Sequence, residues 1–79
     1  NAKQKKAVKQ LITVLEEAED ADTIQSAIFE AARDNDIKVG KFFRILYKIL
    51  LNTSCGPKLG PYIYTIGPKK VAKTLRKNL

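Results

Sequence analysis

The sequence predicts an all-α domain, a small bundle of about five helices. Apolar residues recur at spacings of three and four along the chain, and no stretch alternates apolar and polar residues as a half-buried strand would. Three Gly-Pro pairs occur near the C-terminal end, and two of them, Gly60-Pro61 and Gly67-Pro68, mark the starts and ends of short helices. Seventy-nine residues, 44% of them hydrophobic, are enough for one domain with a limited core. We therefore expect residues 1–79 to form a single, monomeric helical domain.

The first expected helix covers about Lys5 to Glu19. One apolar stripe runs along it, made of Val8, Leu11, Ile12, Leu15 and Ala18. Lysines occupy its start and glutamates its end, which opposes the helix macrodipole. We infer that the lysines between Lys3 and Lys9 either continue a longer helix or form an exposed arm.

The second and third helices follow from capping and hydrophobic patterns. Asp22 with Gln25 three residues later resembles a capping box, and Asp34-Asn35-Asp36 supplies turn-forming residues at the other end. The third helix is expected at about Val39 to Leu51. Its apolar surface is the broadest in the chain, so we expect it to be the central and most buried helix.

The last two helices are expected to be short. Gly60-Pro61 opens one that runs to about Ile66, and Gly67-Pro68 ends it and starts another, to about Lys77. Glycine suits the residue that closes a helix, and proline suits the first residue of the next.

The charges are separated along the chain. All eight acidic residues lie between Glu16 and Asp36, whereas Ile37 to Leu79 contains ten basic residues and no acid, and the net charge is +7. A block of one sign repels itself and destabilises the compact state. A polyanionic partner is the simplest reason to tolerate this, and nucleic acid is the first candidate. The plainer alternative is a solvated basic face.

Catalytic and metal chemistry are not expected from this composition. The chain has no histidine, so it lacks the default general base, and its single cysteine, Cys55, has no partner for a disulfide or a zinc site. We expect no cofactor, and Cys55 to be a buried or incidental thiol. No stretch is typical of a signal peptide or a membrane span, which favours a cytoplasmic location. The absence of methionine and the start at Asn1 favour a fragment of a longer protein.

The region from Ile24 onward resembles the C-terminal end of class I, archaeal-type lysyl-tRNA synthetases. The resemblance rests on an aromatic-rich helix that contains Phe42-Phe43 and ends in Leu50-Leu51, then on a Gly-Pro-Lys-Leu-Gly-Pro block at residues 56–61 and a final helix that begins after Gly67. Glutamyl-tRNA synthetases have a looser version of the same pattern. The chain departs from the pattern at Asn52, where the family often has glycine, and at Pro68.

The resemblance implies a helical domain that holds the anticodon end of transfer RNA, with the catalytic domain of the parent synthetase upstream. RNA loops are bound by aromatic or arginine stacking and by basic contacts to phosphate. The candidate RNA-binding residues are Lys41, Arg44, Lys48, Lys58, Tyr62, Tyr64, Lys69 and Lys70. Tyr47 is assigned to the core instead, and lysines late in a helix have the alternative role of complementing its dipole.

Two other functions fit the same composition. One is a DNA-binding helical domain, although the connection from Asp34 to Gly40 is long for a helix-turn-helix. The other is a protein-interaction module whose basic residues meet an acidic partner. Binding compared among transfer RNA, duplex DNA and an acidic peptide would separate these possibilities.

Overall fold

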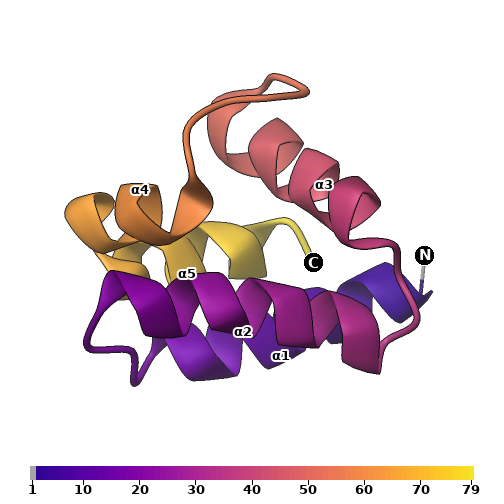
Figure 1. The fold of residues 1–79 in the computed structure, drawn as a ribbon, viewed down its shortest axis with the longest axis horizontal. Coiled ribbons are helices and arrows are strands. Elements are labelled where there is room, and N and C mark those ends of the chain that lie inside the picture. Colours follow the sequence, from indigo (N-terminus) through magenta and orange to yellow (C-terminus); the bar gives the residue numbers. More distant parts are fainter. Residues whose placement is uncertain (1) are drawn as a thin grey trace.

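The computed structural model describes residues 2–79, which fold into five α-helices and no strand (Figure 1). The helices are α1 (Ala2–Leu15), α2 (Ala21–Asp34), α3 (Val39–Leu51), α4 (Leu59–Ile66) and α5 (Pro68–Lys77). The predicted all-α class, the bounds of the third helix and the two short final helices are therefore confirmed.

The first helix begins and ends earlier than predicted. It starts at Ala2 and ends at Leu15, so the lysines from Lys3 to Lys9 are part of α1 and do not form a separate arm. The residues after Leu15 form a turn, in which the Glu16 N–H still donates to the Ile12 carbonyl oxygen and the Glu17 N–H to the Val14 carbonyl oxygen. Glu16 and Glu17 therefore directly follow the last turn of α1, where their negative charge opposes the helix dipole as predicted.

The capping box predicted at Asp22 is wrong. The N-cap of α2 is Asp20, which has extended backbone angles and accepts a hydrogen bond from the backbone N–H of Thr23 at 2.7 Å. This bond lowers the pKa of the Asp20 carboxyl below its ordinary value, because it stabilises the charged form. The Gln25 side chain instead accepts a hydrogen bond from the backbone N–H of Gly60 in α4.

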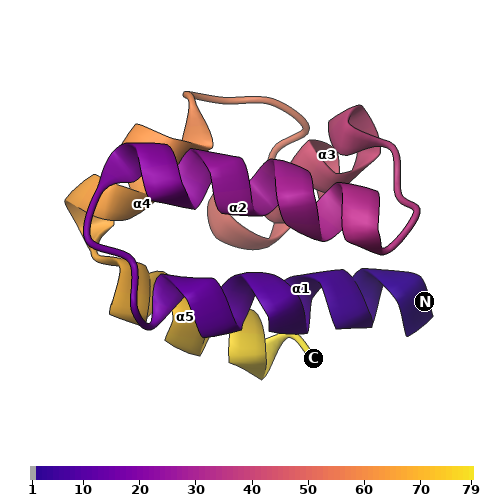
Figure 2. The same cartoon turned by 60° about the horizontal axis from the view of Figure 1, so that its bottom comes forward.

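The core is centred on α2, not on α3. Helix α2 packs against α1, α3 and α4, and α1 and α2 each bury five residues. Helix α3 buries only two residues, Phe42 and Leu46, and lies at one side of the molecule (Figures 1 and 2). The prediction that α3 is the most buried helix is therefore wrong. Its broad apolar surface is divided between the core and half-exposed flanks.

Glycine at position 60 allows α4 to approach the start of α2. A Cβ there would lie 2.7 Å from the Ala21 carbonyl oxygen and 2.9 Å from the Gln25 side chain. The Gly60 N–H donates to Gln25 Oε1 at 2.7 Å, so a side chain of α2 satisfies one of the free N–H groups at the start of α4. Gly67, at φ +118°, makes the turn into α5, whose first residue is Pro68 as predicted.

Two other connections explain features of the sequence. Asn52 caps α3 in the left-handed region at φ 55°, which asparagine tolerates better than other side chains; the departure from glycine is conservative in this respect. The connection between α2 and α3 has four residues, 35–38, and not seven. Its length therefore falls within the range of a helix-turn-helix, so the expectation that the connection is too long for that motif is wrong. Within residues 2–79, no helix combines the length and apolar character needed to cross a membrane.

Candidate nucleic-acid interface

The basic stripe of α3 is fully presented to solvent. Lys41, Arg44 and Lys48 are spaced three and four apart, so they lie on one face of the helix, and all three are exposed. Within the described part of the chain, the only ion pairs are those of Lys3 with Asp36 and Arg76 with Glu16, so this stripe keeps its full positive charge. Lys48 lies in the last turn of α3, where it also complements the helix dipole.

An aromatic row runs beside the basic stripe. The rings of Phe29 and Phe43 meet edge to face at 5.5 Å, and Phe43 and Tyr47 lie 6.2 Å apart. Phe43 and Tyr47 precede Arg44 and Lys48 by one residue each, so the two sets occupy adjacent faces of α3.

The row is open to solvent at Phe29, which is 42% exposed, while Phe43 and Tyr47 are half-buried. The core assignment of Tyr47 is correct only in part, because its hydroxyl donates to the Pro57 carbonyl oxygen at 2.8 Å. The sequence did not predict this row: Phe29 lies in the apolar stripe of α2 and was not among the candidate RNA-binding residues. A signal was available, because Phe29 lies at the edge of that stripe.

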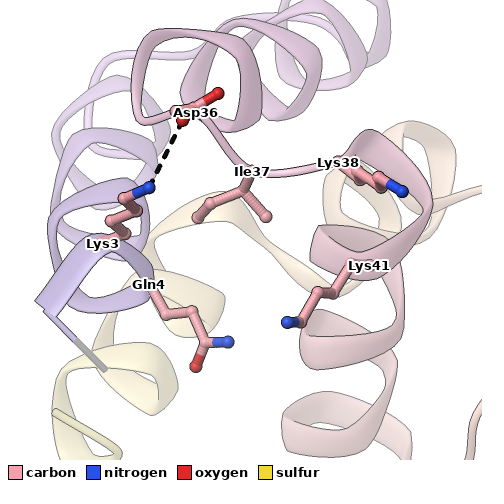
Figure 3. A pocket seen from close by; sticks show the side chains of 6 residues that line it. All are labelled: Lys3, Gln4, Asp36, Ile37, Lys38 and Lys41. Atoms are coloured by element: carbon pink, nitrogen blue, oxygen red, sulfur yellow. Dashed lines mark hydrogen bonds and ion pairs between the residues drawn. The ribbon is translucent and has the colours of Figure 1, made fainter.

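An open groove of about 420 Å³ lies at the start of this surface, between α1 and α3 (Figure 3). Lys3 reaches from α1 to Asp36, at an N–O distance of 3.3 Å, and Lys41 extends from α3 toward Gln4. Ile37 projects between the two helices, and Lys38 points away from the groove. The groove therefore has one compensated lysine, Lys3, and Lys41 as a basic group without an ion-pair partner.

The other predicted residues do not join the α3 stripe. Lys58 is exposed in the connection before α4. Tyr62, half-buried, and Lys70 line one groove of about 200 Å³ together with Leu50 of α3. Tyr64, two residues further along α4, lies on another side of that helix and is 52% exposed.

Lys69 lies toward a different part of the molecule. It lines a groove with Leu15 and Glu16 at the end of α1. The eight candidates thus separate into the α3 stripe, the Tyr62–Lys70 groove and isolated exposed residues.

The described residues include one thiol, at Cys55, and no cluster of metal-binding side chains. Cys55 is exposed and free, so it is not a buried thiol. Among residues 2–79, no three His, Cys, Asp or Glu side chains gather closely enough to hold a metal ion. The surface offers cations, hydroxyl groups and aromatic faces, which are the groups that RNA-binding surfaces use.

Comparison with known proteins identifies the family. The anticodon binding domain family matches residues 1–79. Two lysine–tRNA ligases, from Cenarchaeum symbiosum strain A and from Haloarcula marismortui, are 40% and 35% identical over 95% and 91% of this chain. A third, from Borrelia garinii subsp. bavariensis, is 36% identical over 92%.

The chain spans only 14%, 13% and 15% of the length of these three relatives, respectively. No solved structure matches the chain with significance. The resemblance to lysyl-tRNA synthetases that the Gly-Pro-Lys-Leu-Gly-Pro block indicated is confirmed. The chain therefore belongs to the anticodon-binding domain family, in the form that it shares with lysine–tRNA ligases.

Proposed function

We propose that this domain binds the anticodon end of a transfer RNA through the exposed surface of α3. The observation that supports this most directly is the basic stripe of Lys41, Arg44 and Lys48 beside the row of Phe29, Phe43 and Tyr47. Cations bind the phosphates of a loop, and an exposed ring offers a platform for an unpaired base. Family membership supports the choice of RNA over duplex DNA or an acidic protein.

We propose further that the chain is a C-terminal, monomeric portion of a cytoplasmic lysine–tRNA ligase and is not catalytic alone. The relatives are about seven times longer than the matched region, which leaves room for a catalytic domain upstream. The chain itself has no histidine. A pure preparation should therefore show no lysine-dependent pyrophosphate exchange, and measurable exchange would contradict this proposal.

The test is a salt titration of transfer-RNA binding. The wild type is compared with a variant that carries Lys41→Ala, Arg44→Ala and Lys48→Ala. The logarithm of the binding constant should fall linearly with the logarithm of the salt concentration, with a slope of roughly −0.7 to −0.9 per contacted phosphate. In the triple variant this slope should be smaller, by the amount that about two to three phosphate contacts contribute. If the folded triple variant keeps the affinity and slope of the wild type, this face is solvated surface only.

Two single substitutions separate stacking from charge. Phe29→Ala should weaken binding by about fivefold or more without changing the salt slope, since stacking on an aromatic ring is worth roughly 1–3 kcal/mol per base. Arg44→Ala should reduce both affinity and slope, whereas Lys6→Ala, which removes an exposed charge from α1, is the matched control and should have a smaller effect.

A further inference from the structure

A second basic surface lies on α1 and α5. On α1, Lys5, Lys9 and Glu16 are spaced four and seven apart, so they lie along one edge of the helix and its continuation. On α5, Lys69, Lys73 and Arg76 are spaced four and three apart and form one edge in the same way. All six residues are exposed.

The helices that carry these two edges are neighbours in the structure. Helices α1 and α5 pack against each other, and Arg76 pairs with Glu16 across the contact. In Figure 2, α1 and α5 lie at the lower side of the molecule, whereas α3 lies at the upper side. We call Lys5, Lys9, Lys69, Lys73 and Arg76 the α1–α5 surface.

The α1–α5 surface has a large excess of positive charge. Glu16 is the one acid on the two edges, and Arg76 already engages it. Within the part of the chain that the structure describes, the four lysines have no ion-pair partner. Bringing like charges together opposes the packing of α1 on α5, and a polyanion bound there would remove that opposition.

The α1–α5 surface differs from the α3 surface because it has no aromatic residue. Neither α1 nor α5 contains phenylalanine, tyrosine or tryptophan, so this surface cannot stack on an unpaired base. Unpaired RNA is bound largely by such stacking, whereas double-helical RNA is bound through its phosphates and 2′-hydroxyl groups.

We propose that the α1–α5 surface binds the phosphate backbone of double-helical RNA, separately from the loop contacts of α3. The proposal rests on the proposed function in taking RNA as the partner, and it adds the paired stem of that RNA as a second ligand. Contacts to phosphate carry no base information, so this surface adds affinity without sequence preference.

The test uses two probes and two variants of equal charge. One variant carries Lys5→Gln, Lys9→Gln and Lys73→Gln, and its matched control carries Lys41→Gln, Arg44→Gln and Lys48→Gln. The probes are a blunt RNA duplex of about 16 base pairs, a length that spans successive grooves, and an unpaired RNA of about seven nucleotides. Circular dichroism checks that both variants, which change only exposed residues, remain folded.

The expected result is that the two variants lose binding to different RNA probes. The α1–α5 variant should bind the duplex about tenfold more weakly at low salt, with two to three fewer counterions released, and should bind the unpaired RNA within about twofold of the wild type. Equal weakening of duplex binding by both variants would overturn the proposal, because net charge alone would then explain it; unchanged duplex binding would overturn it as well. Loss of unpaired-RNA binding in the α3 variant tests the proposed function independently.

Discussion

At the scale of single residues, Gly60 and Gly40 differ in whether the surrounding structure leaves room for a side chain. A Cβ at position 60 would meet backbone of α2, whereas a Cβ at position 40, near the start of α3, would meet nothing within 4 Å. The first glycine is therefore required by packing, and the second is not. Because both glycines lie inside helices, comparing an alanine substitution at each position isolates the effect of the steric clash on stability.

We predict that Gly60→Ala destabilises the domain by about 1–3 kcal/mol, because the Ala21 carbonyl and Gln25 must move apart from α4. Gly40→Ala should instead be neutral or stabilise by up to about 1 kcal/mol, since alanine has the higher helix propensity. Urea unfolding followed by circular dichroism measures both. Equal effects of the two substitutions would show that α4 and α2 adjust without cost.

Asp20 makes stability depend on pH through its cap. The Thr23 N–H lowers the pKa of the Asp20 carboxyl, so the folded value lies below the unfolded value of about 3.9. The stabilisation is present above the unfolded pKa and is lost as the pH falls through the folded pKa. Asp20→Asn keeps a capping oxygen but does not titrate, so it should lose less stability than the wild type between about pH 6 and pH 2.

The control for this pH dependence is Asp22→Asn. It removes the same charge from the first turn of α2 but leaves the cap of Asp20 in place. Urea unfolding at about pH 6 and about pH 2 should show that Asp22→Asn loses as much free energy of unfolding on acidification as the wild type does. If Asp22→Asn and Asp20→Asn behave alike, general charge and not the cap controls the response.

At the scale of the elements, α2 organises the domain because it contacts helices on several sides. It packs on α1, holds the start of α4 through Gln25, and meets α3 at the Phe29–Phe43 contact. This leaves one face of α3 free for the basic stripe and the aromatic row. The helix that carries the candidate interface is therefore positioned by the core but is not its centre.

The contact between Gln25 and Gly60 should couple α2 to α4. Gln25→Ala leaves the part-buried Gly60 N–H without its acceptor, and we expect a loss of about 1–3 kcal/mol. Gln25→Glu keeps an acceptor and places a negative charge at the start of α4, so it should lose less. Urea unfolding and hydrogen exchange of the Gly60 amide measure the two effects. Equal losses would mean that this hydrogen bond contributes little.

At the scale of the whole molecule, the net charge of +7 is confined to a domain with extents of 27, 24 and 22 Å. At about 0.01 M salt the Debye length is about 30 Å, so every charge acts on every other. At about 0.15 M it is about 8 Å, and repulsion between distant lysines is screened. The exposed pairs of Lys3 with Asp36 and Arg76 with Glu16 offset little of this repulsion.

We therefore predict that the melting temperature rises when sodium chloride increases from about 0.01 M to about 0.3 M. The physical reason is that screening weakens the repulsion among fifteen basic residues more than it weakens two exposed ion pairs. Thermal unfolding by circular dichroism gives the measurement. A melting temperature that falls with salt would show that attractive pairs dominate the electrostatics of the folded state.

The sequence by itself determined the helical class, the bounds of α3 and the start of α5 at Pro68. These features depend on local chemistry: the period of apolar residues, the closing glycine and the fixed φ of proline act within a few residues. The Gly-Pro-Lys-Leu-Gly-Pro block also indicated the family, because its residues resemble a pattern known from lysyl-tRNA synthetases. The basic stripe of α3 could also be predicted, because its residues recur at the spacing of one face of a single helix.

Only the tertiary structure decided which helix is central, where α2 is capped and which charges share a surface. The broad apolar surface of α3 shows how much of the helix is able to pack, but not how much of it neighbouring helices cover. Asp20 and Asp22 are both good capping residues, and the path of the turn before α2 decides between them. Phe29 meets Phe43, and Arg76 pairs with Glu16, across contacts between helices far apart in the chain. Such contacts depend on how helices pack, which periodicity along a single helix does not specify.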